Sequence, residues 1–144
     1  HSEYVSWIIH AVGPVYRINR FQIGEGSIAG SDAVGTDKNE YFHSLDLKLV
    51  SAYRASLERA REVGARTLAF PLLSAGVFRG GRCLDEIIEI GVVTLVHSIV
   101  NDTENGFDEI CIYSYTKEER EAFEKVGRKV QRCLEQDDDF TNHF

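Results

Sequence analysis

Residues 67–81, TLAFPLLSAGVFRGG, decide the predicted fold. The first four residues of this stretch form a short apolar run, which predicts a parallel strand buried on both faces. Pro71 has no amide hydrogen, so we expect it to end the pairing of that strand. Small residues follow, and then two glycines precede a long helical pattern that begins near Cys83.

This order of strand, small-residue loop and helix suits the binding of an anion. Backbone N–H groups can point at the ligand there, and the helix dipole favours negative charge. We therefore interpret Ser74, Ala75 and Gly76 as the floor of a phosphate site. The alternative is that small residues only permit a tight connection between the strand and the helix, and these residues alone do not decide between the two.

Two further elements are predicted before this stretch. Residues 4–12, YVSWIIHAV, are rich in β-branched and aromatic side chains and stop at Gly13-Pro14, which predicts a buried strand. Residues 44–63 carry apolar side chains at helical spacing, with Ser44 as the expected N-cap and Gly64 as the expected stop. With the strand at 67–70 they predict a right-handed βαβ unit.

The pattern repeats after the loop. Residues 84–100 predict a second helix, in which Gly91 marks a close approach to the sheet. Residues 109–115, EICIYSY, predict a third strand. Residues 116–119, TKEE, match a capping box that starts a last helix running to about Leu134. The elements together predict an α/β fold.

Composition limits the classes of function. The chain has 144 residues, 43% of them hydrophobic, and a net charge of -7. It contains neither a signal peptide nor an apolar run of the roughly 20 residues that cross a membrane, so we expect an intracellular protein, cytoplasmic or nuclear. The acidic surface argues against nucleic-acid and membrane partners. The three cysteines lie far apart, which predicts reduced, partly buried thiols, and neither a cofactor nor a metal ion is expected.

The domain organisation is predicted to be simple. Residues 1–136 are expected to form one domain, and residues 137–144 an acidic C-terminal tail. Residues 17–43 show no sustained period and are rich in glycine, serine and acids, which predicts a mobile insertion.

The ligand site is expected where the strands end. Ligands of open α/β sheets sit beyond the carboxyl ends of the strands, and these ends are Val12-Gly13-Pro14, Pro71-Leu72 and Ser114-Tyr115. Tyr115 could stack on a flat base and Phe78 could cover a sugar, although either ring could instead be a core contact. The sequence has no glycine-rich nucleotide motif and no nucleophile with an obvious partner. It predicts a nucleotide-like or phosphorylated ligand and no particular reaction.

Three stretches together resemble the macro domain, an ADP-ribose-binding module of the Appr-1''-p processing family. They are WIIHAVGPVY, AYRASLERAREVGARTLAFPLLSAGVF and EICIYSYTKEEREAFEKV. The resemblance implies a three-layer α/β/α, Rossmann-like sheet. It also implies a diphosphate loop, an aromatic residue against the adenine or its ribose, and a pocket floor. The diphosphate loop is Ser74, Ala75, Gly76, Val77 and Phe78, the aromatic residue is Tyr115, and the floor is Val12, Gly13, Pro14, Pro71 and Leu72. Arg79 stands where the family commonly has glycine.

The resemblance covers only the later half to two-thirds of the module. Macro domains begin with further strands, a helix and a ribose loop where the catalytic residues usually lie, and residues before Tyr4 cannot supply them. We therefore expect a truncated chain; the alternatives are that a partner segment, a second copy or the 17–43 insertion completes the sheet.

The resemblance implies two classes of function. The first is binding of ADP-ribose or ADP-ribosylated protein, with hydrolysis of an ADP-ribosyl linkage or of ADP-ribose 1''-phosphate in the intact protein. The second is a non-catalytic interaction or scaffold domain that keeps the fold without a complete site. No catalytic residue is assigned for either.

Overall fold

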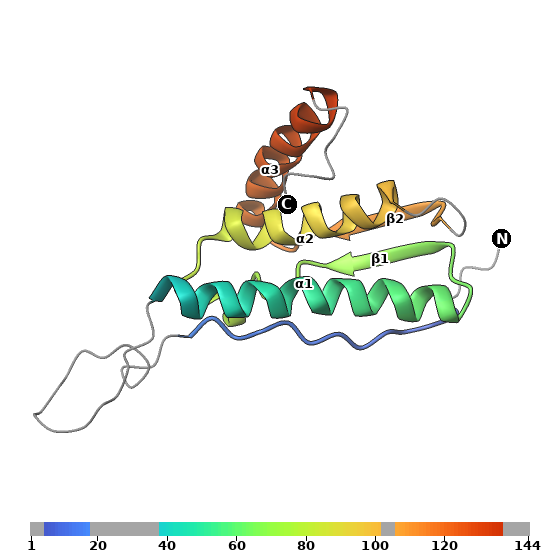
Figure 1. Cartoon of the computed structure of the whole chain (residues 1–144), viewed down its shortest axis with the longest axis horizontal. Helices are drawn as coiled ribbons and strands as arrows, with labels where there is room; N and C mark the ends of the chain where they lie inside the picture. The colour runs from blue at the N-terminus through green and yellow to red at the C-terminus, as the bar shows by residue number, and fades with distance from the viewer. Residues whose placement is uncertain (1–4, 18–37, 102–105, 137–144) are drawn as a thin grey trace, which may run out of the picture.

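The computed structural model describes residues 5–17, 38–101 and 106–136 (Figure 1). Its elements are α1 (Lys38–Glu62), β1 (Thr67–Pro71), the 3-10 turn η1 (Val77–Arg79), α2 (Leu84–Val100), β2 (Glu109–Tyr113) and α3 (Lys117–Gln136). The two strands pair in parallel, with Thr67 opposite Glu109 and Pro71 opposite Tyr113. Because α2 connects them, β1, α2 and β2 form a βαβ unit. The predicted α/β class is confirmed.

The core lies between β1 and the helices α1 and α2. Tyr53 of α1 packs on Phe70 of β1, with ring centroids 5.8 Å apart. The predicted close approach at Gly91 of α2 is present, but its neighbour is α1 and not the sheet. A β-carbon at Gly91 would lie 2.8 Å from the Tyr53 ring. The buried side chains that share this core include Leu49, Leu57, Ile87, Ile88 and Leu95.

The helix ends follow the predicted local chemistry. Gly64 has φ +70, and its N–H donates to Arg61 O while that of Ala65 donates to Ala60 O, which makes a Schellman motif at the end of α1. At the start of α3, the Glu119 N–H donates to the Thr116 hydroxyl (3.1 Å) and the Thr116 N–H to the Glu119 carboxylate (2.9 Å). The predicted capping box is therefore confirmed. Of the apolar side chains of α3, Val126 and Val130 are buried, whereas Leu134, near its end, is exposed.

The predicted first strand is wrong for this structure. Residues 5–12 run extended beside α1 (Figure 1) but pair with no strand in the described part of the chain. The βαβ unit that would have used them is consequently absent there. The prediction that the strand at 67–70 is buried on both faces is also wrong, because Thr67, Ala69 and Pro71 are exposed while Phe70 is buried.

The start of the first helix was predicted too late. The helix α1 begins at Lys38, so residues 38–43 of the expected insertion are helical, and Ser44 lies inside the helix with its hydroxyl donating to Tyr41 O (2.8 Å). Residues 18–37 and the predicted acidic tail at 137–144 lie outside the described residues. All three cysteines are free thiols, although Cys83 is exposed and not partly buried as expected. Among the helices of the described ranges, none has the length and apolarity to span a membrane.

Candidate functional site

The candidate site is the loop at residues 72–78, which follows β1 and includes the first two residues of η1. This loop is anchored on its inner side. Leu73 and Ser74 are buried, and the Leu73 N–H donates to the Tyr53 hydroxyl at 3.0 Å. Burial raises the pKa of Tyr53 to about 12, although the bond from Leu73 acts in the opposite direction. Ser74 has φ +60, a left-handed conformation that a serine adopts only under local constraint. The loop therefore leaves β1 along a fixed path.

Residues 13–16 hold the other side of this loop. The Ser74 hydroxyl donates to Pro14 O at 2.8 Å, and a β-carbon at Gly13 would lie only 2.3 Å from that hydroxyl oxygen. Two residues further on, the Tyr16 N–H donates to Phe78 O at 2.7 Å. Gly80 has φ +56 and lies against Tyr16 O, so only glycine fits there. The ends of the extended segment and of β1 thus meet, as the sequence predicted.

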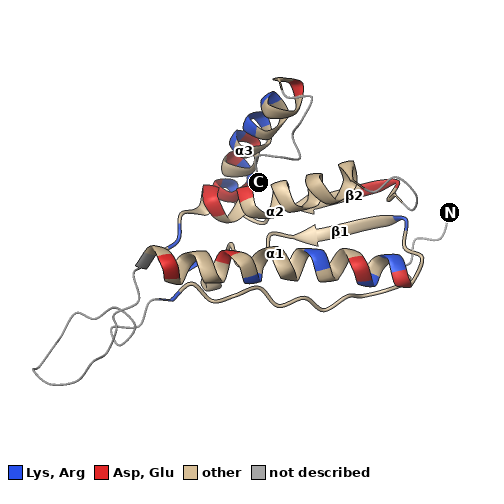
Figure 2. Cartoon of the chain, viewed as in Figure 1, with Lys and Arg blue, Asp and Glu red and all other residues tan. Residues whose placement is uncertain are grey.

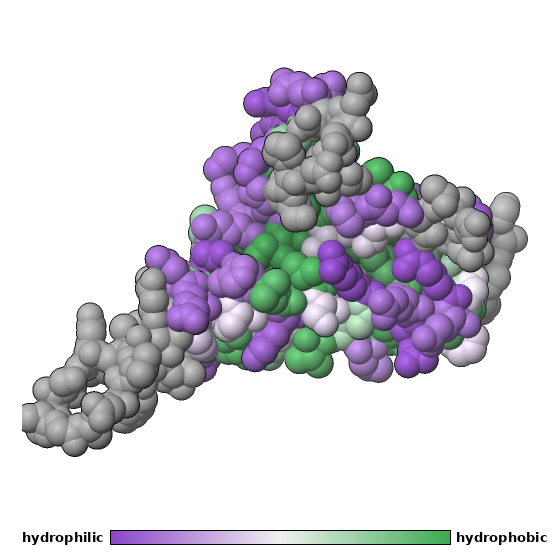
Figure 3. Space-filling model, viewed as in Figure 1, coloured by the Kyte–Doolittle hydropathy of each residue, from purple (hydrophilic) through white to green (hydrophobic). Residues whose placement is uncertain are grey.

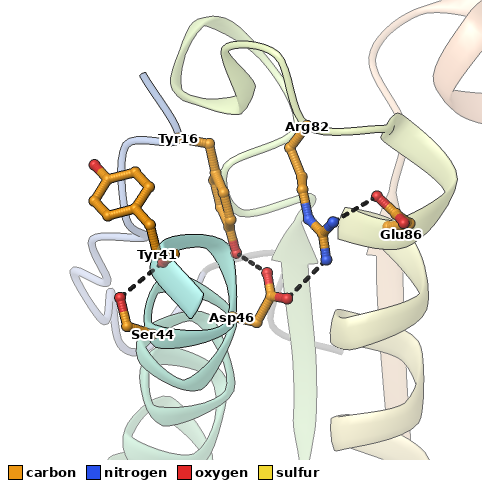
Figure 4. Close-up of polar contacts among 6 residues, drawn as sticks. All are labelled: Tyr16, Tyr41, Ser44, Asp46, Arg82 and Glu86. Atoms are coloured by element: carbon orange, nitrogen blue, oxygen red, sulfur yellow. Dashed lines mark hydrogen bonds and ion pairs between the residues drawn. The ribbon is translucent and has the colours of Figure 1, made fainter. Parts of the chain in front are cut away.

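Tyr16 is the anchor of the extended segment (Figure 4). It is completely buried, and its hydroxyl donates to Asp46 of α1 at 2.9 Å. The other oxygen of Asp46 accepts a bond from Arg82 at 2.7 Å, and Arg82 also pairs with Glu86 of α2 at 2.9 Å. Burial and the neighbouring Asp46 carboxylate raise the pKa of Tyr16 well above its usual range. This network fixes the loop relative to both helices.

The outer part of the loop presents free backbone donors. The N–H groups of Gly76, Val77 and Phe78 donate to no acceptor among the described residues, and Val77 is 75% exposed. A β-carbon at Gly76 would meet nothing within 4 Å. Consecutive N–H groups without a protein acceptor, in a fixed loop, are a donor set that can bind phosphate oxygens.

The N-terminus of α2 contributes less to this donor surface than the sequence predicted. The turn η1 stands between the loop and α2, and the first turn of α2 carries Asp85 and Glu86. These carboxylates already complement the helix dipole. Arg79, in η1, supplies positive charge instead, and its guanidinium lies 3.8 Å from the Glu118 carboxylate of α3. Its Nε is buried and has no hydrogen-bond partner within the described ranges.

Tyr115 lies at the end of β2 with its ring open to solvent. The residue is 96% exposed, and the Tyr115 N–H donates to the Glu119 carboxylate at 2.6 Å, which ties it to the α3 capping box. The ion pair between Arg79 and Glu118 connects the loop to this same end of α3. The Tyr115 ring is therefore not a core contact in this structure. The remaining alternative is that the ring is a surface on which a flat ligand group could stack.

The predicted floor residues occupy different environments. Gly13 is buried and Pro14 and Leu72 are half-buried, whereas Val12 and Pro71 are exposed. A cavity of about 610 Å³ is lined mainly by β1 and the segment 5–11 and does not include the loop residues 74–78. Nowhere in the described ranges do three or more His, Cys, Asp or Glu side chains group so that they could hold a metal ion.

Two tyrosines that hold the loop on its inner side, Tyr53 and Tyr16, were not predicted from the sequence. The sequence places Tyr53 on a helix and Tyr16 in a loop and gives neither a role, although each makes a buried contact that sets the loop backbone. Their partners are 20 or more residues distant in sequence, so no local pattern could reveal them. The one available signal is that tyrosine, when buried, needs a partner for its hydroxyl.

Comparison with known proteins relates this geometry to one family. Residues 32–81 match the family model described as the Macro domain. A macro domain-containing protein of Streptomyces coelicolor is 36% identical over 101 residues, which are 70% of this chain and 45% of the relative. An ADP-ribose glycohydrolase of Archaeoglobus fulgidus is 30% identical over 79 residues, 55% of this chain and 38% of the relative.

Solved structures agree with the sequence comparisons. An Oceanobacillus iheyensis macrodomain with ADP superposes with a TM-score of 0.52 at 18% identity, covering 65% of this chain and 47% of that one. A mutant macrodomain from the same organism, solved with ADPR, gives the same score and identity. The resemblance to the macro domain is thereby confirmed, and the chain shares the macrodomain fold over this region. It spans less than half of the length of these relatives.

Proposed function

We propose that this chain binds ADP-ribose, or the ADP-ribosyl group of a modified protein, through the loop at residues 74–78. One observation carries the proposal: Gly76, Val77 and Phe78 present backbone N–H groups without an acceptor among the described residues, in a loop that Tyr53 and residues 13–16 hold in place. A diphosphate offers several oxygen acceptors to such donors, and preorganised donors bind an anion without a further ordering cost.

The similar proteins support the choice of ligand. One relative is named an ADP-ribose glycohydrolase, and the similar macrodomain structures were solved with ADP and with ADPR. In the proposed complex the diphosphate lies on the loop, Arg79 adds positive charge at its edge, and the adenosine extends toward Tyr115. The outer part of the loop and Tyr115 are exposed, so a protein attached to the distal ribose is compatible with the site.

Hydrolysis is a separate step that the described residues do not explain. Catalysis at the distal ribose would require a positioned water and a group that accepts its proton. The loop supplies hydrogen-bond donors that can bind charge, but it contains no carboxylate or imidazole. We therefore propose binding as the function of these residues and assign none of them a catalytic role.

Calorimetric titration with ADP-ribose tests the proposal. The unmodified chain should bind in the micromolar range, about -8 kcal/mol. Gly76→Glu should abolish binding, because its carboxylate would occupy the diphosphate position and repel it. A β-carbon at Gly76 meets open space, but the backbone there has ψ -128 at φ -85, outside the main regions that other residues adopt. Circular dichroism of the variant therefore checks that it is folded before its affinity is compared.

Gly127→Glu is the matched control. Gly127 lies in α3, and its added side chain also meets open space, so this variant has the same change of charge away from the loop. It should bind ADP-ribose like the unmodified chain. Equal affinity of the Gly76→Glu variant, or no binding by the folded unmodified chain, would refute the proposed site.

A further inference from the structure

Arg79 follows the donor loop directly and has a fixed backbone. It is the last residue of η1, and its N–H donates to Gly76 O at 3.0 Å. Its own carbonyl oxygen accepts the Arg82 N–H, also at 3.0 Å. The next residue, Gly80, lies against Tyr16 O with φ +56. The backbone of Arg79 is therefore tied to the loop on one side and to the buried anchor of the extended segment on the other.

The Arg79 side chain connects the loop to the start of α3. Its guanidinium lies 3.8 Å from the carboxylate of Glu118, in the first turn of that helix. The neighbouring Glu119 accepts the Tyr115 N–H at 2.6 Å. The guanidinium therefore lies at the end of the candidate site where Tyr115 presents its ring.

The contact with Glu118 uses little of the binding capacity of Arg79. A separation of 3.8 Å is longer than a hydrogen bond, and the Arg79 Nε has no partner among the residues that the structure describes. The two side chains are 31% and 71% exposed, and ion pairs between exposed groups are weak. A phosphate group can instead accept two parallel hydrogen bonds from one guanidinium. Such a phosphate would displace the Glu118 carboxylate.

Arg79 differs in this respect from Arg82, which is close to it in sequence. Figure 2 shows basic residues on the coil that leads into α2 and charges of both signs along α3, and in the view of Figure 3 the visible surface of α3 is mainly hydrophilic. Arg82 is engaged by Asp46 at 2.7 Å and by Glu86 at 2.9 Å. Of these two arginines, Arg79 is therefore the one that a ligand can recruit.

The ligand placement proposed above brings one particular group to Arg79. The diphosphate lies on the loop donors and the adenine extends toward Tyr115, so the adenosine ribose lies between them. A ribose hydroxyl is a neutral acceptor, whereas a phosphate attached to that hydroxyl forms a stronger, charge-assisted bond with a guanidinium. In dinucleotide-binding proteins an arginine beside this ribose accommodates a 2'-phosphate.

We propose that Arg79 makes the site selective for ADP-ribosyl ligands that carry a phosphate on the adenosine ribose. The inference rests on the proposed function, because the loop donors place the ribose. On binding, the guanidinium leaves Glu118 and contacts two oxygens of the additional phosphate, while the diphosphate stays on the loop. A glycine at this position, which the macro domain family commonly has, could not make the contact.

Calorimetric titration with two ligands, ADP-ribose and ADP-ribose 2'-phosphate, tests the inference. The unmodified chain should bind the 2'-phosphate about tenfold more tightly, and this preference should fall as the salt concentration rises, because the additional contact is ionic. Arg79→Gln should abolish the preference and should change the affinity for ADP-ribose much less, since the loop donors remain. The ratio of the two affinities reports the contact, because partial unfolding of a variant would lower both affinities alike.

Two further variants provide controls. Arg128 pairs with Glu124 at 3.8 Å, the separation found for Arg79 and Glu118, but lies further along α3. Arg128→Gln therefore removes the same charge from a similar ion pair and should keep the preference. Glu118→Gln should increase the preference, because the phosphate no longer competes with a carboxylate for the guanidinium.

The contrary outcomes separate this inference from the proposed function. Equal affinity of the unmodified chain for the two ligands, or a preference that persists in the Arg79→Gln variant, would overturn the inference and leave the loop site intact. A preference for ADP-ribose that Glu118→Gln removes would also overturn it, because the carboxylate would then bind the ribose hydroxyls. Absence of binding of either ligand by the folded chain would refute the proposed function together with this inference.

Discussion

At the scale of single residues, Gly91 shows how a sequence signal and a tertiary contact combine. A glycine inside a helix costs about 1 kcal/mol relative to alanine, so its presence predicts a close approach. The structure supplies the neighbour: the Tyr53 ring, whose hydroxyl also accepts the Leu73 N–H. Gly91 therefore makes room for the tyrosine that holds the start of the candidate loop.

Gly91→Ala should lower the free energy of unfolding by about 1–2 kcal/mol. Overpacking in a core typically costs about 1–3 kcal/mol, and the gain in helix propensity offsets up to about 1 kcal/mol of it. Urea unfolding followed by circular dichroism measures the change. Gly127→Ala is the control, because the new β-carbon meets open space in α3. This substitution should stabilise the chain by up to about 1 kcal/mol through the higher helix propensity of alanine. Equal effects of the two substitutions would contradict the contact.

At the scale of elements, local signals predicted helix ends better than strands. The Schellman glycine and the capping box each depend on a few adjacent residues, and both are confirmed. The bounds of α2 agree with the predicted 84–100. The start of α1 was missed because residues 38–43 contain only two apolar side chains, Tyr41 and Phe42, and the Phe42 ring packs on distant Tyr16.

The strand predictions failed where the result depended on a partner strand or on a layer that covers the sheet. Residues 5–12 have the composition of a strand, but a strand also needs a hydrogen-bonding partner, and composition cannot supply one. In the same way, the exposure of Ala69 and Thr67 depends on what covers the second face of the sheet. The loop at 74–78 lies at the end of β1, as predicted. The contacts that hold it could not be predicted, because Tyr53 and Tyr16 are distant from it in sequence.

The capping box at the start of α3 offers a test at this scale. Thr116→Ala should lower the free energy of unfolding by about 1 kcal/mol, since the Glu119 N–H loses its acceptor. Thr116→Ser keeps the hydroxyl and should change stability much less. Denaturant titration distinguishes the two variants. If alanine and serine gave the same stability, the hydroxyl bond would contribute nothing measurable to α3.

At the scale of the whole molecule, the two surfaces of interest are separate. The loop at 74–78 lies beyond the end of β1 and offers backbone donors, while the cavity of about 610 Å³ lies along β1 and the segment 5–11 and is lined mainly by apolar residues. Gly13 lies against Ser74 between the two. ADP-ribose binding as proposed requires the outer loop and its supports.

An NMR titration of the backbone amides with ADP-ribose locates the ligand on the chain. The largest and saturable chemical-shift changes should fall on the amides of Gly76, Val77 and Phe78, with smaller changes at Tyr115. Amides beside the cavity along β1, such as Leu68 and Ile9, should shift little. Largest changes at these cavity amides, with the loop amides unmoved, would contradict the proposed site. So would the absence of any change at millimolar ADP-ribose, which corresponds to a binding free energy weaker than about -4 kcal/mol.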